Sequence, residues 1–152
     1  MERPLRGGWS LVAQTAELLA QARTELSAHC NTVEEAYEFM LAYAGQGLAS
    51  DSGSAKGTQV REYLTKAEAA LGGLSSVVNA FVGTENDPVL GPIAAFMKVI
   101  EADAHASRAA VRLVLTLPAI SSQVIDNLNA SIHLRALLTD LFLVDEVLKG
   151  IK

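Results

Sequence analysis

Apolar residues recur every three or four positions along most of this chain. The first such stripe consists of Trp9, Val12, Ala16, Leu19, Leu26 and Cys30. This spacing places side chains on one face of an α-helix, whereas a half-buried strand would alternate apolar and polar residues. No segment shows convincing alternation, and the hydrophobic half of the chain is mainly Ala, Leu and Val, with 5% aromatic residues. The sequence therefore predicts an all-α protein.

A chain of 152 residues is close to the usual size of one domain with one core. We predict a single up-and-down helical bundle of five to seven helices over residues 1–152. Residues 1–8, "MERPLRGG", contain Pro and Gly and are expected to form a flexible leader.

The first helix is expected to end near His29. Asn31 and Thr32 would then interrupt the chain, because Thr32 and Glu35 have the spacing of a capping box, which favours the start of a new helix. A second helix should run from Val33 to about Ala44.

Residues 45–57, "GQGLASDSGSAKG", are rich in Gly and Ser and predict a mobile loop. Lys56, Gly57 and Thr58 are in the wrong order for a phosphate-binding loop, and no strand precedes them. Thr58 is instead expected to cap the next helix. That helix should break or bend at the two glycines of residues 72–73.

The segment "VIEADAHASRAAVRLV", residues 99–114, carries charged groups on an otherwise apolar helix, which should start near residues 87–92 and last until Leu117. Its polar stripe consists of Glu101, His105, Arg108 and Arg112. Glu101 and His105 are spaced as an exposed pair across one helical turn.

Asp103 is the exception, because helical periodicity places it on the apolar side of this helix, one turn before Ser107. A buried carboxylate is costly, so Asp103 needs a donor, a gap open to water, or a ligand. The expected donors are Ser107, Asn127, Asn129, His133 and Arg135. Asp103 and Ser107 are also the candidate polar anchor for a ligand.

The last segment has two apolar stripes that are out of phase with each other. One consists of Ile120, Val124, Leu128 and Ile132, and the other of Leu134, Leu138, Leu141, Val144 and Leu148. A straight helix would expose one of them, so either the chain breaks at residues 129–131 or a partner covers the second stripe. We expect both the break and a partner. The predicted interface, with a second copy as the default partner, consists of Leu134, Leu138, Leu141, Phe142 and Leu148.

Several classes of protein are disfavoured by composition and spacing. A net charge of −5 without a cluster of Lys and Arg argues against binding nucleic acid. The longest uncharged run, residues 69–84, is too short to span a membrane, and no secretory signal is visible, so we expect a cytoplasmic protein. The single Cys30 cannot form an internal disulfide, and the Glu-x-x-His motif of di-iron bundles is absent, so we expect neither a metal nor another cofactor.

Two functional classes remain, and both are non-enzymatic because no catalytic constellation is visible. The first is a binding or assembly module that acts through the apolar face of the C-terminal helix. The alternative is a carrier or sensor of a hydrophobic small molecule or lipid held between the helices, with the Gly-rich loop as a gate and Asp103 as its polar anchor.

Overall fold

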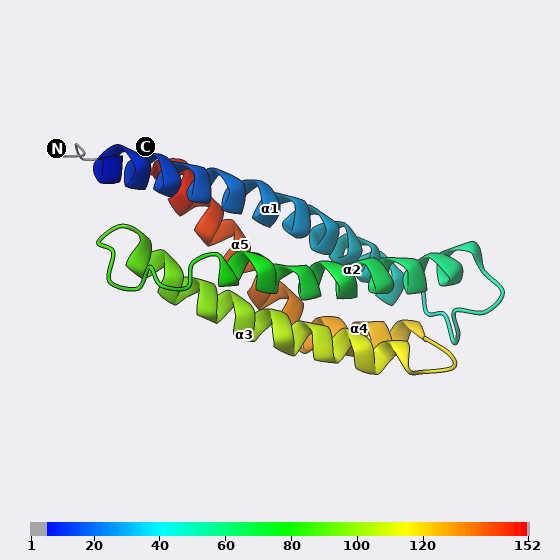
Figure 1. Cartoon of the computed structure of the whole chain (residues 1–152). Coiled ribbons are helices and arrows are strands. Elements are labelled where there is room, and N and C mark those ends of the chain that lie inside the picture. The colour runs from blue at the N-terminus through cyan, green and yellow to red at the C-terminus, as the bar shows by residue number, and fades with distance from the viewer. Residues whose placement is uncertain (1–5, 152) are drawn as a thin grey trace, which may run out of the picture.

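The computed structural model describes residues 6–151, and their side chains from Gln14 onward. Within this range the chain forms helices and no strand (Figure 1). The five helices are α1 (Arg6–Ala44), α2 (Ala55–Asn79), α3 (Leu90–Leu115), α4 (Ser122–Ala130) and α5 (His133–Gly150). The predicted all-α bundle is confirmed, at the low end of the expected number of helices. Residues 1–5 of the expected leader lie outside the described residues, and its last three residues belong to α1.

The helices form a bundle of four arms, in which α4 and α5 together make the fourth arm (Figure 1). Successive arms run in opposite directions. α2 packs between α1 and α3, and α5 closes the bundle by packing against both α3 and α1. The last part of α5 returns to the first half of α1, where Arg23 forms an ion pair with Asp145 at 3.5 Å. None of the helices in the described range is both long and apolar enough to cross a membrane.

α1 is a single helix of 39 residues, about 58 Å long at the rise of an α-helix. The expected break near Asn31 was wrong. Thr32 does not cap a helix, because its hydroxyl donates to the Ala28 carbonyl oxygen one turn earlier, at 3.2 Å. The buried stripe also stays in phase across this point, through Ala22, Leu26, Val33, Ala36, Met40 and Tyr43. Neither Asn nor Thr stops a helix as Pro does. Packing of this buried stripe therefore allows α1 to continue past Asn31 and Thr32.

α2 begins with Ser54 as its N-cap, whose hydroxyl accepts from the Gly57 amide at 3.0 Å. The expectation that Thr58 caps this helix was therefore wrong by one turn. The expected break at residues 72–73 is also absent. A Cβ at Gly73 would lie 2.6 Å from Cε1 of His29, and one at Gly72 would lie 3.0 Å from Cζ of Arg108. The two glycines therefore leave space for the side chains of His29 and Arg108, which pack closely against α2.

α3 starts where the sequence indicates, because the Asp87 carboxylate accepts from the amides of Val89 and Leu90, both at 2.8 Å. The break predicted at residues 129–131 is confirmed. α4 ends at Ala130 and α5 starts at His133, with Ile132 between them in the left-handed backbone region at a φ of 63°. With this break the second stripe is wholly buried, and so are Ile120 and Leu128 of the first stripe, whereas Ile132 is exposed.

Candidate functional site

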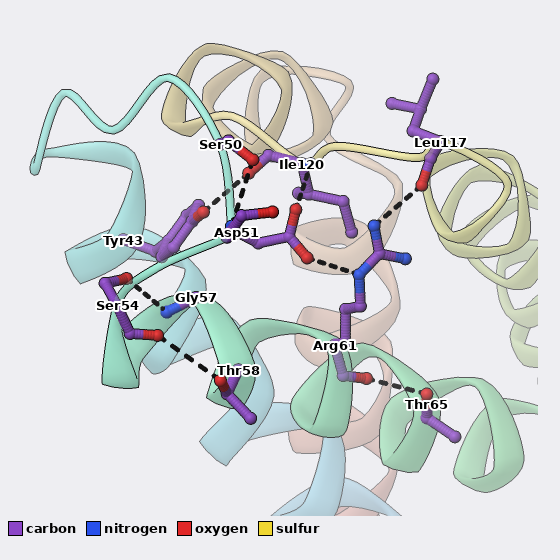
Figure 2. Close-up of polar contacts among 11 residues, drawn as sticks. Tyr43, Ser50, Asp51, Ser54, Gly57, Thr58, Arg61, Thr65, Leu117 and Ile120 are labelled. Atoms are coloured by element: carbon purple, nitrogen blue, oxygen red, sulfur yellow. Dashed lines mark hydrogen bonds and ion pairs between the residues drawn. The ribbon is translucent and has the colours of Figure 1, made fainter.

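Asp51 lies where the loop between α1 and α2 meets the loop between α3 and α4 (Figure 2). Its carboxylate forms an ion pair with Arg61 of α2 and accepts from the Ile120 amide at 2.7 Å. Arg61 also donates from Nη2 to the Leu117 carbonyl oxygen at 2.8 Å. The hydrogen bonds from Arg61 and from the Ile120 amide hold the pKa of Asp51 below its usual value. The α3–α4 loop is thus fixed from both of its ends.

A second set of contacts fastens the start of α4 to α1. The Ser122 hydroxyl donates to the Tyr43 carbonyl oxygen at 2.7 Å and accepts from the Leu48 amide at 2.9 Å. The Ser122 amide donates to the Leu48 carbonyl oxygen at 2.8 Å, and the Tyr43 hydroxyl donates to the Ile120 carbonyl oxygen at 2.7 Å. The loop expected to be too rich in Gly and Ser to pack is therefore held in place through Leu48 and Asp51.

These contacts draw α4 toward α1 and away from α3. Ile125 and Leu128 of α4 are buried, and α4 packs more extensively against α1 than against α3. An open groove of about 450 Å³ lies between the C-terminal half of α3 and α4. We name it the α3–α4 groove, and its lining residues are Ala110, Leu113, Val114, Leu117, Val124, Asn127, Leu128 and Ser131.

The α3–α4 groove is apolar except near the end of α4. Within the described residues none of its lining side chains is charged, and its polar side chains are Asn127 and Ser131. Asn127 Oδ1 accepts from Gln123 at 3.4 Å, and the Ser131 hydroxyl donates to the Leu128 carbonyl oxygen at 2.6 Å. Leu113, one of the lining residues, has 71% of its surface exposed. The groove thus combines an apolar wall with hydrogen-bonding groups at one end.

Asp103, the residue singled out from the sequence, faces α5. Its neighbour on α5 is Asp140, which was not among the expected donors. Burial, and then the neighbouring Asp103, raise the pKa of Asp140 to about 7. Ser107 is fully buried, and its hydroxyl has no hydrogen-bond partner within the described residues. The structure therefore shows Asp103 beside a second acid, which is not the donor that the sequence suggested.

The residues expected to form an interface lie mostly inside the bundle. Leu134, Leu138, Leu141 and Leu148 are each at most 6% exposed, because α5 packs this face against α3 and α1. For these four residues the interface expectation is corrected, since the chain's own helices cover them. Phe142 differs, with 48% of its surface exposed.

The polar stripe of α3 is only partly a solvent-exposed surface. Arg108 and Arg112 both pair with Glu68 of α2, at 2.8 and 3.2 Å, and so tie α3 to α2. Among the side chains described, neither a hydrogen bond nor an ion pair joins Glu101 to His105, so that expected pair was wrong.

Cys30 is half-buried beside a small cavity of about 120 Å³ between α1 and α5. Burial, followed by the charges of Glu34 and Asp145, raises the pKa of its thiol to about 11. A thiol that holds its proton so firmly is a poor nucleophile at neutral pH.

Sequence reasoning missed the α3–α4 groove and Asp140. Asp140 had a visible signal, because it lies three residues after Leu137 and four before Val144, and both of these are buried. The α3–α4 groove had no signal in the sequence, because it depends on the distance between α4 and α3.

The described residues contain no group of three or more His, Cys, Asp or Glu side chains arranged to hold a metal ion. No protein-family model, curated protein or solved structure matches this chain. Any proposal about the function of this protein therefore rests on the geometry of its sites.

Proposed function

We propose that this protein binds a small, uncharged, mainly apolar molecule in the α3–α4 groove. The observation that carries the proposal is the groove itself, whose volume of about 450 Å³ falls within the range of small-molecule sites. An occupant would cover the exposed side of Leu113 and remove apolar surface from water. The sequence analysis gave a carrier or sensor of a hydrophobic molecule as the alternative function. The proposal keeps that function but places the ligand in a site that the sequence did not indicate.

The lining also specifies the chemistry of the occupant. Leu117 and Val124 lie at the end nearest the α3–α4 loop, so an apolar tail or ring belongs there. Asn127 and Ser131 lie toward the opposite end, where one hydroxyl, carbonyl or ether group of the ligand can form a hydrogen bond. A charged group would find no counter-charge among the lining residues.

The fixed loop at one end of the groove supports binding by a preformed site. Leu117 lines the groove, and its carbonyl oxygen is held by Arg61, which is itself held by Asp51. Because this wall is already fixed, a ligand does not have to order it, and less binding energy is lost on association.

The test uses the uncharged apolar dye Nile red, whose emission rises in apolar surroundings. Ala110→Phe places a ring in the groove, and Ala109→Phe is the matched control, since Ala109 is exposed and does not line the groove. We expect the wild type and Ala109→Phe to bind the dye equally, and Ala110→Phe to bind it at least about tenfold more weakly. Equal binding by all three proteins, or none by the wild type, would contradict the proposal.

Native mass spectrometry of freshly purified protein provides an independent measurement. A retained small molecule should appear as an added mass on the wild type and on Ala109→Phe, and be absent from Ala110→Phe. An added mass that persists in Ala110→Phe would place the ligand elsewhere.

Assembly through α5 is the second candidate function, with a second copy of this chain as the partner. It is supported by the outer side of α5, where Phe142, Leu143 and Val147 are each about half exposed. This surface differs from the face predicted from the sequence, because the four leucines of that face are buried.

A further inference from the structure

A short chain of polar contacts joins one wall of the α3–α4 groove to the α1–α2 loop, residues 45–54 (Figure 2). Leu117 is one of the residues that line the groove, and its carbonyl oxygen accepts from Nη2 of Arg61 at 2.8 Å. Arg61 in turn forms an ion pair with Asp51, which belongs to this loop. The groove wall is therefore separated from the α1–α2 loop by a single arginine side chain.

The wall that α4 contributes is tied to the same loop. Val124 lines the groove, and its amide donates to the Ser121 hydroxyl at 3.1 Å. The next residue along, Ser122, forms two hydrogen bonds with Leu48 of the α1–α2 loop. Its hydroxyl accepts from the Leu48 amide at 2.9 Å, and its amide donates to the Leu48 carbonyl oxygen at 2.8 Å. The end of α3 and the start of α4 are thus both held by contacts that lead to one loop.

We name this set of contacts the latch. It consists of Asp51 with Arg61, Asp51 with the Ile120 amide, Arg61 with the Leu117 carbonyl oxygen, and Ser122 with Leu48. The Asp51 side chain is 10% exposed and that of Arg61 is 35% exposed, so water competes only partly for their contact. Hydrogen bonds between charged groups in such surroundings are short and directional. The latch therefore fixes the position of the α3–α4 loop.

We propose that the latch makes this protein a sensor, in which a ligand in the α3–α4 groove and the closed α1–α2 loop stabilise each other. With the latch closed, Leu117 and Val124 are held in the groove wall, where they contact the ligand. With the latch open, the α3–α4 loop is released and the ligand loses apolar contact at this end. A carrier needs only the groove, whereas a sensor needs occupancy to change a surface elsewhere, which here is the α1–α2 loop.

This inference rests on the proposed function, and thermodynamic linkage makes it quantitative. If the closed latch strengthens ligand binding by some factor, the ligand must favour the closed latch by the same factor. The ligand therefore changes the stability of hydrogen bonds that it does not touch. The amides of Leu48, Ile120 and Ser122 report on the latch, because each donates a hydrogen bond within it and none of the three residues lines the groove.

Amide hydrogen exchange of the wild type, with and without saturating Nile red, is the first measurement. We expect exchange at the Leu48, Ile120 and Ser122 amides to slow about tenfold when the dye is bound. The control is the Leu90 amide, which donates to Asp87 at the start of α3, at the opposite end of the bundle (Figure 1). Its exchange should be unchanged. Unchanged exchange at the three latch amides, or equal slowing at Leu90, would overturn the proposal.

Asp51→Asn provides the second measurement, because it removes the charge that holds Arg61. We expect this variant to bind Nile red about tenfold more weakly than the wild type, a loss similar in size to the slowing of exchange. Bound dye should no longer slow exchange at the latch amides of the variant. Asp145→Asn is the matched control, since it also changes a carboxylate that pairs with an arginine of another helix, but Asp145 does not line the groove. It should bind the dye like the wild type.

Failure of the sensor proposal is distinguishable from failure of the groove to bind a ligand. A wild type that does not bind Nile red would overturn both. If the wild type binds the dye and Ala110→Phe does not, but the latch amides and the affinity of Asp51→Asn are unchanged, the groove is a carrier site and the sensor proposal alone is overturned. If Asp51→Asn does not fold, the exchange measurement on the wild type decides by itself.

Discussion

Ile132 joins α4 to α5 with a φ of 63°, and it is the one non-glycine residue with a positive φ in the described part of the chain. This conformation brings Cβ close to the backbone and costs an ordinary residue roughly 1–2 kcal/mol. A β-branched side chain is especially poorly suited to it. Ile132 is also 53% exposed, so its side chain recovers little through packing. The chain break that rotates α5 therefore rests on a strained residue.

Replacing Ile132 with Asn should stabilise the protein by about 1 kcal/mol, because Asn tolerates the left-handed region without the added backbone freedom of Gly. Urea unfolding measures the gain. Val147→Asn is the control, since Val147 is similarly exposed but lies within α5, where Asn gives no such benefit. If Ile132→Asn is no more stable than Val147→Asn, the strain at this hinge is negligible.

At the scale of elements, the two loops at one end of the bundle act as a unit. Asp51 contacts α2 through Arg61 and the α3–α4 loop through Ile120 (Figure 2). Gly57 lies directly beneath it, so close that a Cβ there would overlap the carbonyl oxygen of Asp51. The absence of a side chain at Gly57 therefore allows the loop to close onto α2.

Asp51 should make the stability of the protein depend on pH in the acid range. Its pKa is lowered in the folded protein, so its contribution is present above the ordinary pKa of Asp and is lost as the pH falls through the folded value. Asp51→Asn should cost about 2 kcal/mol at pH 7, because Arg61 loses its carboxylate partner. This cost should shrink below about pH 4, where the wild-type acid is also being protonated.

Thermal unfolding of wild type and Asp51→Asn from about pH 3 to pH 7 measures this difference. Asp126→Asn provides the reference for an exposed acid. A cost that is the same at every pH would show that Asp51 acts through shape alone, and a negligible cost would show that the loops are held by other contacts.

At the scale of the whole molecule, the C-terminal helix closes the bundle. Leu141 is 2% exposed and packs in the core, whereas Leu143, two residues later, is 54% exposed. The helix therefore has one face that the chain covers itself and another that faces outward.

This arrangement predicts opposite results for two similar substitutions. Leu141→Glu should unfold the protein, because it buries an unpaired charge in the core. Leu143→Glu should remain folded, with stability within about 1 kcal/mol of the wild type. Circular dichroism measures folding, and analytical ultracentrifugation measures the oligomeric state.

The same two variants test assembly through α5. A wild type that is monomeric at high concentration would contradict self-association. A wild-type dimer that Leu143→Glu converts into a folded monomer would support it through the outer side of the helix. If the wild type is a dimer, a folded, monomeric Leu141→Glu would support the interface predicted from the sequence and contradict the burial of Leu141.

The sequence by itself determined the features that depend on local periodicity and capping. Spacings of three and four predicted an all-α bundle, and the change of phase between the stripe that ends at Ile132 and the stripe that begins at Leu134 predicted the break before α5. The helical phase of Asp103 also identified it as an acid on an apolar face. Each of these can be recognised because one helix's own residues carry the pattern.

Only the tertiary structure decided which neighbour covers each face. Packing buries one continuous stripe of α1, which stays helical through Asn31, and α2 stays helical through its two glycines, where His29 and Arg108 fill the space beside them. The tertiary structure also covered the leucines of α5, placed Asp140 beside Asp103, and left α4 far enough from α3 to form a groove. A periodic pattern records that a face is apolar, but the distance and identity of the element packed against it depend on the whole chain.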